Sequence, residues 1–285
     1  MRRHNLRHPA WMQLKFHTAF VSVLMASASG AAASPSVLEP TSKWVVNYAD
    51  DMCLLERWFG TGRHSVELAF EADSMGQGAD LHIMRTGAPY AREKANVRVL
   101  ADGADVAIIH SSTYSVPSKG VILTNLFLDR DQLSKLGAAT EIAFSPDRDE
   151  ATRLTVPAFA AALRALETCR ADLVLGWGMS LADQARIKSE AKSSFKGAGG
   201  FSSDDYPNSA LRGNEQGKAR VRLRVDANGK VTECFVMHSS GSADLDKETC
   251  DVYRTRYHYS PAVDTYGKPM ASFVVSSVVW AIPGN

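Results

Sequence analysis

The feature that most constrains the fold is a strict alternation of apolar and basic residues near the C-terminus. The apolar positions are Ala219, Val221, Leu223 and Val225, and the basic positions between them are Arg220, Arg222 and Arg224. A period of two places all the apolar side chains on one face of a β-strand. The next residues, 226–229, end in Asn228-Gly229, which strongly favours a tight hairpin turn. We therefore predict a half-buried strand that leads into a hairpin.

The elements that follow give this region a definite order. Residues 231–237 form a second strand pattern, which breaks at the Ser-Ser-Gly of 239–241. Residues 245–256 have helical spacing, with Asp244 as the candidate N-cap, and 272–281 are a final strand rich in Val and Ser. The prediction is a two-layer domain over 204–285 with the order strand, strand, helix, strand.

Short motifs lie within and between these predicted elements. They comprise Tyr206, Pro207, Ala210, Gly217, Asp226, Gly229, Val231, Ser239, Ser240, Gly241, Leu245, Asp246, Tyr259, Pro261, Ala262, Gly267, Lys268 and Pro269. Each has a structural role: Pro207 keeps Tyr206 extended, and Gly229 supplies a positive φ. Together they resemble the C-terminal domain of the TonB energy-transducer family, within a subgroup that has a strand cysteine facing a helix cysteine.

The resemblance implies a binding function. Such domains add an extended segment of an outer-membrane receptor to an exposed sheet edge, where main-chain hydrogen bonds provide much of the affinity. The edge implied here is Ser272, Phe273, Val274, Val275, Ser276, Ser277, Val278 and Val279. The partner is then a TonB-dependent receptor or another periplasmic peptide segment. The alternatives are a strand paired on both sides and an edge closed by homodimerisation.

The N-terminus has the layout of a secretory signal peptide. A basic stretch ends at Lys15, an apolar stretch covers 19–25, and a small-residue tail covers 26–33. We expect cleavage near Ala33-Ser34 and a periplasmic location. The alternative is an inner-membrane anchor formed by residues 16–33, although the strongly apolar part is shorter than the ~20 residues of a spanning helix. A cleaved signal leaves coupling to an inner-membrane proton channel doubtful.

If the chain is exported, its four cysteines are informative, because an even number in an exported chain suggests disulfide bonds. Pairing Cys53 with Cys169 and Cys234 with Cys250 staples each half of the chain separately, and we favour it among the three possible connectivities. Four buried free thiols are the alternative. Zinc binding is disfavoured because no C-x-x-C or neighbouring histidine pair provides ligand spacing.

The region 38–179 has the pattern of a strand-rich domain that ends in a helix, and it resembles no family that we identify. Strand patterns occupy 53–59, 65–70, 80–85, 97–100, 106–109, 121–128 and 141–144. Helices are predicted at 129–136 and 158–168, the second closed by Cys169. The polar segment 180–203 is predicted to be a linker, helical at first and then flexible. The fold class is α+β.

Charge and motif content argue against nucleic-acid binding and catalysis. Without residues 1–33 the chain has 28 basic and 31 acidic side chains, so it lacks the positive surface that nucleic acids require. The histidines after residue 33 are His64, His82, His110, His238 and His258, and none has metal-ligand or triad spacing. We predict no metal, no cofactor and no enzyme; the alternative is an active site within 44–177.

Two acidic pairs lack the spacing of an acid–base couple. They are Asp50-Asp51 and Asp204-Asp205, and we interpret both as solvated turns. Two functions therefore remain: a TonB-type protein acting in transport through outer-membrane receptors, and a soluble periplasmic adaptor that uses the same module without energy transduction.

Overall fold

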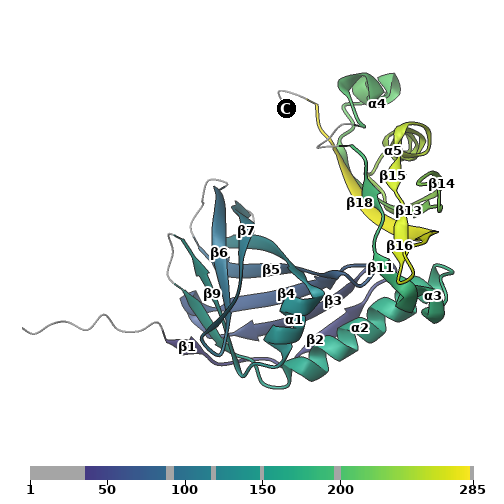
Figure 1. Cartoon of the computed structure of the whole chain (residues 1–285). Helices are drawn as coiled ribbons and strands as arrows, with labels where there is room; N and C mark the ends of the chain where they lie inside the picture. The colour runs from purple at the N-terminus through teal and green to yellow at the C-terminus, as the bar shows by residue number, and fades with distance from the viewer. Residues whose placement is uncertain (1–35, 88–92, 117–119, 148–150, 196–199, 283–285) are drawn as a thin grey trace, which may run out of the picture. The chain divides into compact units, whose positions relative to one another are not determined.

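The computed structural model describes residues 36–87, 93–116, 120–147, 151–195 and 200–282. The predicted signal peptide at 1–33 and the alternative anchor at 16–33 lie outside these ranges. The residues after Ser34 form one compact unit. Its fold is mixed α and β and rich in strands (Figure 1), which confirms the predicted class. In the described ranges, no helix is both long and apolar enough to cross a membrane.

The first part is built on a ten-stranded sheet with the order β1-β10-β9-β6-β7-β8-β5-β4-β3-β2. Neighbouring strands are antiparallel except β1 and β10. The strands are β1 Val37–Leu38, β2 Val45–Tyr48, β3 Cys53–Phe59, β4 Val66–Ala72, β5 Gly78–Thr86, β6 Glu93–Ala101, β7 Ala104–Val116, β8 Val121–Asp129, β9 Glu141–Pro146 and β10 Thr152–Thr155. Every strand predicted in this region is present, whereas β1, β2 and β10 were not predicted.

Two helices pack against this sheet. Helix α1, Arg130–Gly137, begins at Asp129, whose side chain accepts a hydrogen bond from the Gln132 amide in a capping box. Helix α2, Phe159–Gly176, is longer than predicted. Cys169 does not end it, because neither glycine nor proline occurs between Cys169 and Gly176.

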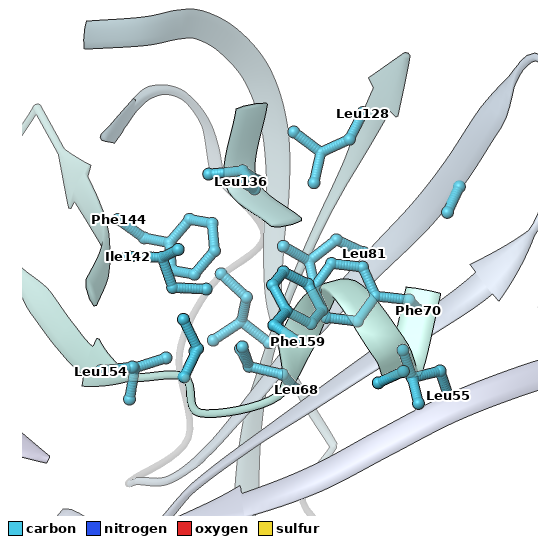
Figure 2. Packing of buried hydrophobic residues seen from close by; sticks show 14 of the residues in the cluster. Leu55, Leu68, Phe70, Leu81, Leu128, Leu136, Ile142, Phe144, Leu154 and Phe159 are labelled. Atoms are coloured by element: carbon cyan, nitrogen blue, oxygen red, sulfur yellow. The ribbon is translucent and has the colours of Figure 1, made fainter. Parts of the chain in front are cut away.

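The core of this part lies between the sheet and α2. Figure 2 shows side chains from several strands, including Phe70 and Leu81, converging with Phe159 of the helix. Phe159 is 1% exposed, and its ring centroid lies 4.8 Å from that of Trp44 and 5.2 Å from that of Phe70. The Cys53–Cys169 disulfide, with both cysteines 1% exposed, joins β3 to α2 beside this core.

The segment 180–203 differs from the predicted linker. It begins with helix α3, Leu181–Arg186, as expected. Two short strands follow: β11 Ile187–Ser189 pairs with β16 Ala262–Asp264, and β12 Lys192–Ser193 pairs with β15 Tyr259–Ser260. Residues 187–193 are therefore held by the C-terminal part, and residues 196–199 lie outside the described ranges.

The C-terminal part confirms the predicted order strand, strand, helix, strand. Its sheet has the order β14-β13-β18, and helix α5 packs on one face (Figure 1). These elements are β13 Gly217–Val225, β14 Val231–His238, α5 Ala243–Arg256 and β18 Ser272–Trp280. The short elements of this part are α4 Asn208–Arg212, β17 Pro269–Met270 and the 3-10 turn Ser203–Asp205. Another 3-10 turn, Gly62–His64, lies in the first part between β3 and β4.

Two details of α5 complete the comparison with the prediction. Its N-cap is Ser242, whose Oγ accepts a hydrogen bond from the Leu245 amide at 3.3 Å, so the prediction of Asp244 is wrong. Asp244 lies instead in the first turn, where it accepts a hydrogen bond from Ser209. The second disulfide joins Cys234 of β14 to Cys250 of α5, and both predicted pairings are confirmed.

Candidate peptide-binding edge

Strand β18 is an edge strand of its sheet. All nine of its residues pair with β13, from Ser272 opposite Val225 to Trp280 opposite Gly217. No described strand pairs with its other side. The alternative of a strand paired on both sides is therefore excluded within the described ranges. The strand contains no charged residue, which is unusual for an edge that lacks a partner.

The predicted edge residues differ in exposure along the strand. Ser272 and Phe273 are buried at 1% and 4% exposure, because Phe273 packs against Trp177 with their ring centroids 5.6 Å apart. Val274, Val275 and Ser276 are partly buried, Ser277 is exposed and Val278 is buried at 9%. Val279 is 70% exposed. The more accessible part of the edge is therefore 274–279, in which only the Val278 side chain is buried.

Helix α5 holds the edge strand in place from one face of the sheet. Trp280 Nε1 donates a hydrogen bond of 2.9 Å to Thr249 Oγ1, and both residues are buried. The Tyr253 hydroxyl lies 2.7 Å from Ser276 Oγ. These bonds fix the strand from two turns of the helix, so its outward N–H and C=O groups are presented by a rigid support.

The motif glycine and the motif serines are turn and cap residues. Gly229 has a φ of +82°, and a Cβ there would lie 1.8 Å from the Tyr259 carbonyl oxygen, so any side chain would collide with the backbone. Asp246 accepts hydrogen bonds from Ser239 Oγ at 2.5 Å and from the Ser240 amide at 2.8 Å. Gly241 follows with a φ of +93°. These residues shape the hairpin and the helix start.

The other motif residues pack the domain. Ala210, Leu245 and Ala262 are fully buried. Tyr206 donates a hydrogen bond to the Glu215 carbonyl at 2.5 Å, and its ring lies 5.3 Å from that of Trp280. Two of the motif prolines lie at the ends of elements: Pro207 is the N-cap of α4, and Pro261 lies between β15 and β16.

Part of the basic face of β13 contacts the first part of the chain, whereas Arg224 on that face is exposed. Arg220 forms an ion pair with Glu71 of β4, and its Nε lies 3.9 Å from Asp51 Oδ2. His238 Nε2 also lies 2.6 Å from that oxygen. Asp51 is only 7% exposed, so the interpretation of Asp51 as a solvated residue is wrong. Asp205 likewise forms an ion pair, with Arg256.

At this interface, ion pairing lowers the pKa of one carboxyl group and burial raises the pKa of another. Burial alone would raise the pKa of Glu71, but the contacts with His82 and Arg220 outweigh it and lower that pKa to about 2. The contact with Glu71 raises the pKa of His82. Burial, together with the charge of Asp73, raises the pKa of Glu190 to about 7. No local pattern in the sequence indicates this cluster, because its members are far apart in the chain.

A cavity of about 280 Å³ lies beside this cluster and reaches the start of β18. Its lining includes Glu71, Asp80, Glu190, Arg220 and residues 273–275. Burial and then the charge of Glu71 raise the pKa of Asp80. No group of three or more metal-ligand side chains is arranged to hold a metal ion within the described ranges. This arrangement closes the buried end of the edge strand and leaves the other end accessible.

No curated protein matches the chain. Residues 203–281 match the family model of the Gram-negative bacterial TonB protein C-terminal domain, which confirms the resemblance drawn from the motifs. The family is a non-enzymatic interaction domain of the Gram-negative envelope. The match thus indicates a TonB-like role in envelope transport or protein interaction for the part that contains β18.

Proposed function

We propose that this protein acts in the periplasm and captures an extended segment of an outer-membrane receptor by strand addition to β18. The observation that carries the proposal is a nine-residue uncharged strand that pairs, among the described strands, on one side only. The match of residues 203–281 to the TonB C-terminal family supports it. The proposed binding segment is 274–279, because the residues before it are buried.

The edge geometry sets the scale of the affinity. In an antiparallel sheet, every second residue of an edge strand directs both its N–H and its C=O outward. The alternate residues of 274–279 that face outward therefore offer about six hydrogen bonds, each worth about 0.5–1.5 kcal/mol net. Ordering the free peptide opposes this gain, so side-chain contacts with Val279 and its neighbours are needed for specificity.

The second candidate is an adaptor that binds a periplasmic peptide without energy transduction. It is favoured by the contacts that build the C-terminal sheet into a larger unit, namely Arg220 with Glu71 and Phe273 with Trp177. An adaptor of this kind would use both parts of the chain for binding. The two candidates share the edge strand and differ in which peptides bind it.

The test is a titration of the full chain with peptides from the periplasmic ends of TonB-dependent receptors, followed by backbone amide NMR. We expect amide shifts confined to residues 274–279 of β18. A matched peptide with the same sequence and with N-methyl groups on alternate amides should bind at least tenfold more weakly, because it lacks the donors for the ladder. Binding unaffected by N-methylation would contradict strand addition.

A variant pair separates the edge from the fold. Ser277→Pro places a proline at an exposed position of the edge, and Glu233→Pro places one at an exposed position of β14, the other edge of the same sheet. We expect only the first to abolish peptide binding while both keep the circular dichroism of the parent. Binding of non-receptor periplasmic peptides, with receptor peptides inactive, would select the adaptor. Shifts in β18 on dilution without any peptide would select homodimerisation.

A further inference from the structure

A second site lies in the first part of the chain, away from β18. A groove of about 730 Å³ runs between α1, α2, α3 and the turn that follows β4. Its walls include Leu133 from α1, Leu163 and Leu166 from α2, and Leu181 from α3. Leu181 is 53% exposed, which is high for a leucine beside an apolar groove. The size is that of a small-molecule site.

Arginine side chains line the same groove. Arg130 Nε and Nη2 donate hydrogen bonds of 2.9 and 2.5 Å to the Gly76 carbonyl. Gly76 has a φ of +73°, and a Cβ there would lie 3.3 Å from Arg170 Nε and 3.4 Å from Arg130 Nη2. Two guanidinium groups therefore converge on this glycine, and a Cβ there would make tight contacts with both of them.

The arginines differ in how far their donors are used. Arg170 is 7% exposed and donates to both oxygens of Glu167, to the Ser74 carbonyl and to Gln184. It serves as a fixed part of the wall. The guanidinium of Arg164 has no hydrogen bond or ion pair within the described ranges, and Nη1 of Arg130 has none there either.

The charges around the groove do not balance. Three arginines line it, and Glu167 is the only carboxylate among the lining residues. Asp73 lies near Arg170, but its Oδ1 accepts hydrogen bonds from the amides of Met75 and Gln77. The groove thus combines apolar walls with positive groups that have spare donors. An anionic head on an apolar chain satisfies both.

We propose that this groove binds a free single-chain amphiphile with a carboxylate head, of the fatty-acid type. The apolar chain lies along Leu133, Leu163 and Leu181, and the carboxylate accepts hydrogen bonds from Arg130 and Arg164. The site is independent of strand capture at β18.

The test is calorimetric titration of the full chain with laurate below its micelle concentration, with dodecanol and dodecyltrimethylammonium as chain-matched probes. We expect saturable binding of one laurate, at least tenfold weaker binding of dodecanol, and no binding of the cation. In the double variant Arg130→Gln/Arg164→Gln, laurate affinity should fall about tenfold while that of dodecanol stays unchanged. Arg98→Gln, a substitution at an exposed ion pair elsewhere, is the control.

A second variant tests the groove by blocking it sterically, without changing its charge. Ala160→Trp places a large side chain at an exposed position of the groove wall, and should abolish laurate binding with an unchanged melting temperature. Equal affinity for the three probes, or laurate binding that survives both the charge variant and the steric variant, would overturn the proposal. Binding to phosphatidylglycerol vesicles without binding of laurate would also overturn it, since the ligand would then be a membrane surface.

Discussion

Two sheets of this protein, the ten-stranded sheet and the sheet β14-β13-β18, have different edges. The ten-stranded sheet ends in β1, with two residues, and β2, with four, so both its edges offer few unpaired backbone groups. The three-stranded sheet β14-β13-β18 has two long edge strands, β18 with nine residues and β14 with eight. Short edge strands are a common protection against unwanted pairing, whereas a long uncharged edge invites it. The contrast agrees with the proposal that the first sheet is a scaffold and that the second binds a partner.

Removing the disulfides should have the largest effect on stability, and it tests this contrast. Cys53–Cys169 spans 116 positions in the sequence and Cys234–Cys250 spans 16. Restriction of the unfolded chain predicts that C53A/C169A costs about 4–5 kcal/mol and C234A/C250A about 3 kcal/mol. Urea unfolding of both variants measures the difference. A larger loss from the short-loop variant would show that the C-terminal part depends more on its staple than its size suggests.

The core of the scaffold provides the next test. Phe159→Ala removes a ring that contacts Trp44 and Phe70, and we expect a loss of about 3–5 kcal/mol in the free energy of unfolding. Phe127→Ala, at 42% exposure, should cost less than about 1 kcal/mol. Calorimetry also reveals coupling: if the C-terminal part melts at its usual temperature in Phe159→Ala, the two sheets are energetically separate.

The contact between the two sheets depends on Arg220. Arg220→Ala leaves the carboxylates of Glu71 and Asp51 without this cation, and we expect a loss of about 2–3 kcal/mol at pH 7. The pKa of Glu71, about 2 in the parent, should rise. The Glu71 contribution is complete above its ordinary pKa and is lost as the pH falls toward 2, so acid should destabilise the variant less than the parent. Arg224→Ala, at an exposed ion pair with Glu233, is the matched control.

The smallest expected effect is a gain in stability. Glu190 has its pKa raised to about 7, so its ionised form is disfavoured in the folded chain. The penalty is absent at pH 4, grows as the pH rises toward 7 and is complete above it. Glu190→Gln should therefore stabilise the protein by about 1 kcal/mol at pH 8, discounted for partial exposure, and change little at pH 4. Equal effects at both pH values would exclude the charge as the cause.

The elements with strong local signals were predictable from the sequence. The alternation around Val221 and the Asn228-Gly229 turn define β13 and β14, and the aspartate before Arg130 defines the start of α1. The cysteine pairing followed from a simple rule, that each half of the chain is stapled by itself. In each case the information lies within a few residues or in a short list of possibilities.

Features that depend on distant partners were missed. Strands β11 and β12 arise from a polar segment with no strand periodicity, and their pairing with β16 and β15 fixes them. Asp51 looked like a turn residue, and its burial comes from His238 and Arg220, far along the chain. The edge strand was predicted as a whole, yet its first two residues are buried by Trp177 and neighbouring residues, which local sequence does not reveal.

The position of the Cys53–Cys169 bond has a mechanical consequence. A pull on the C-terminal part through β18 reaches the first part at the end of α2 and leaves it toward the N-terminus through Cys53 and β2. The disulfide joins those two routes, so the chain between the cysteines carries no tension. That loop would extend to about 400 Å if it were free. Under load, only the residues outside the loop can lengthen, so strands β3 to β10 resist stretching, whereas β1 and β2, which precede Cys53, lack this protection.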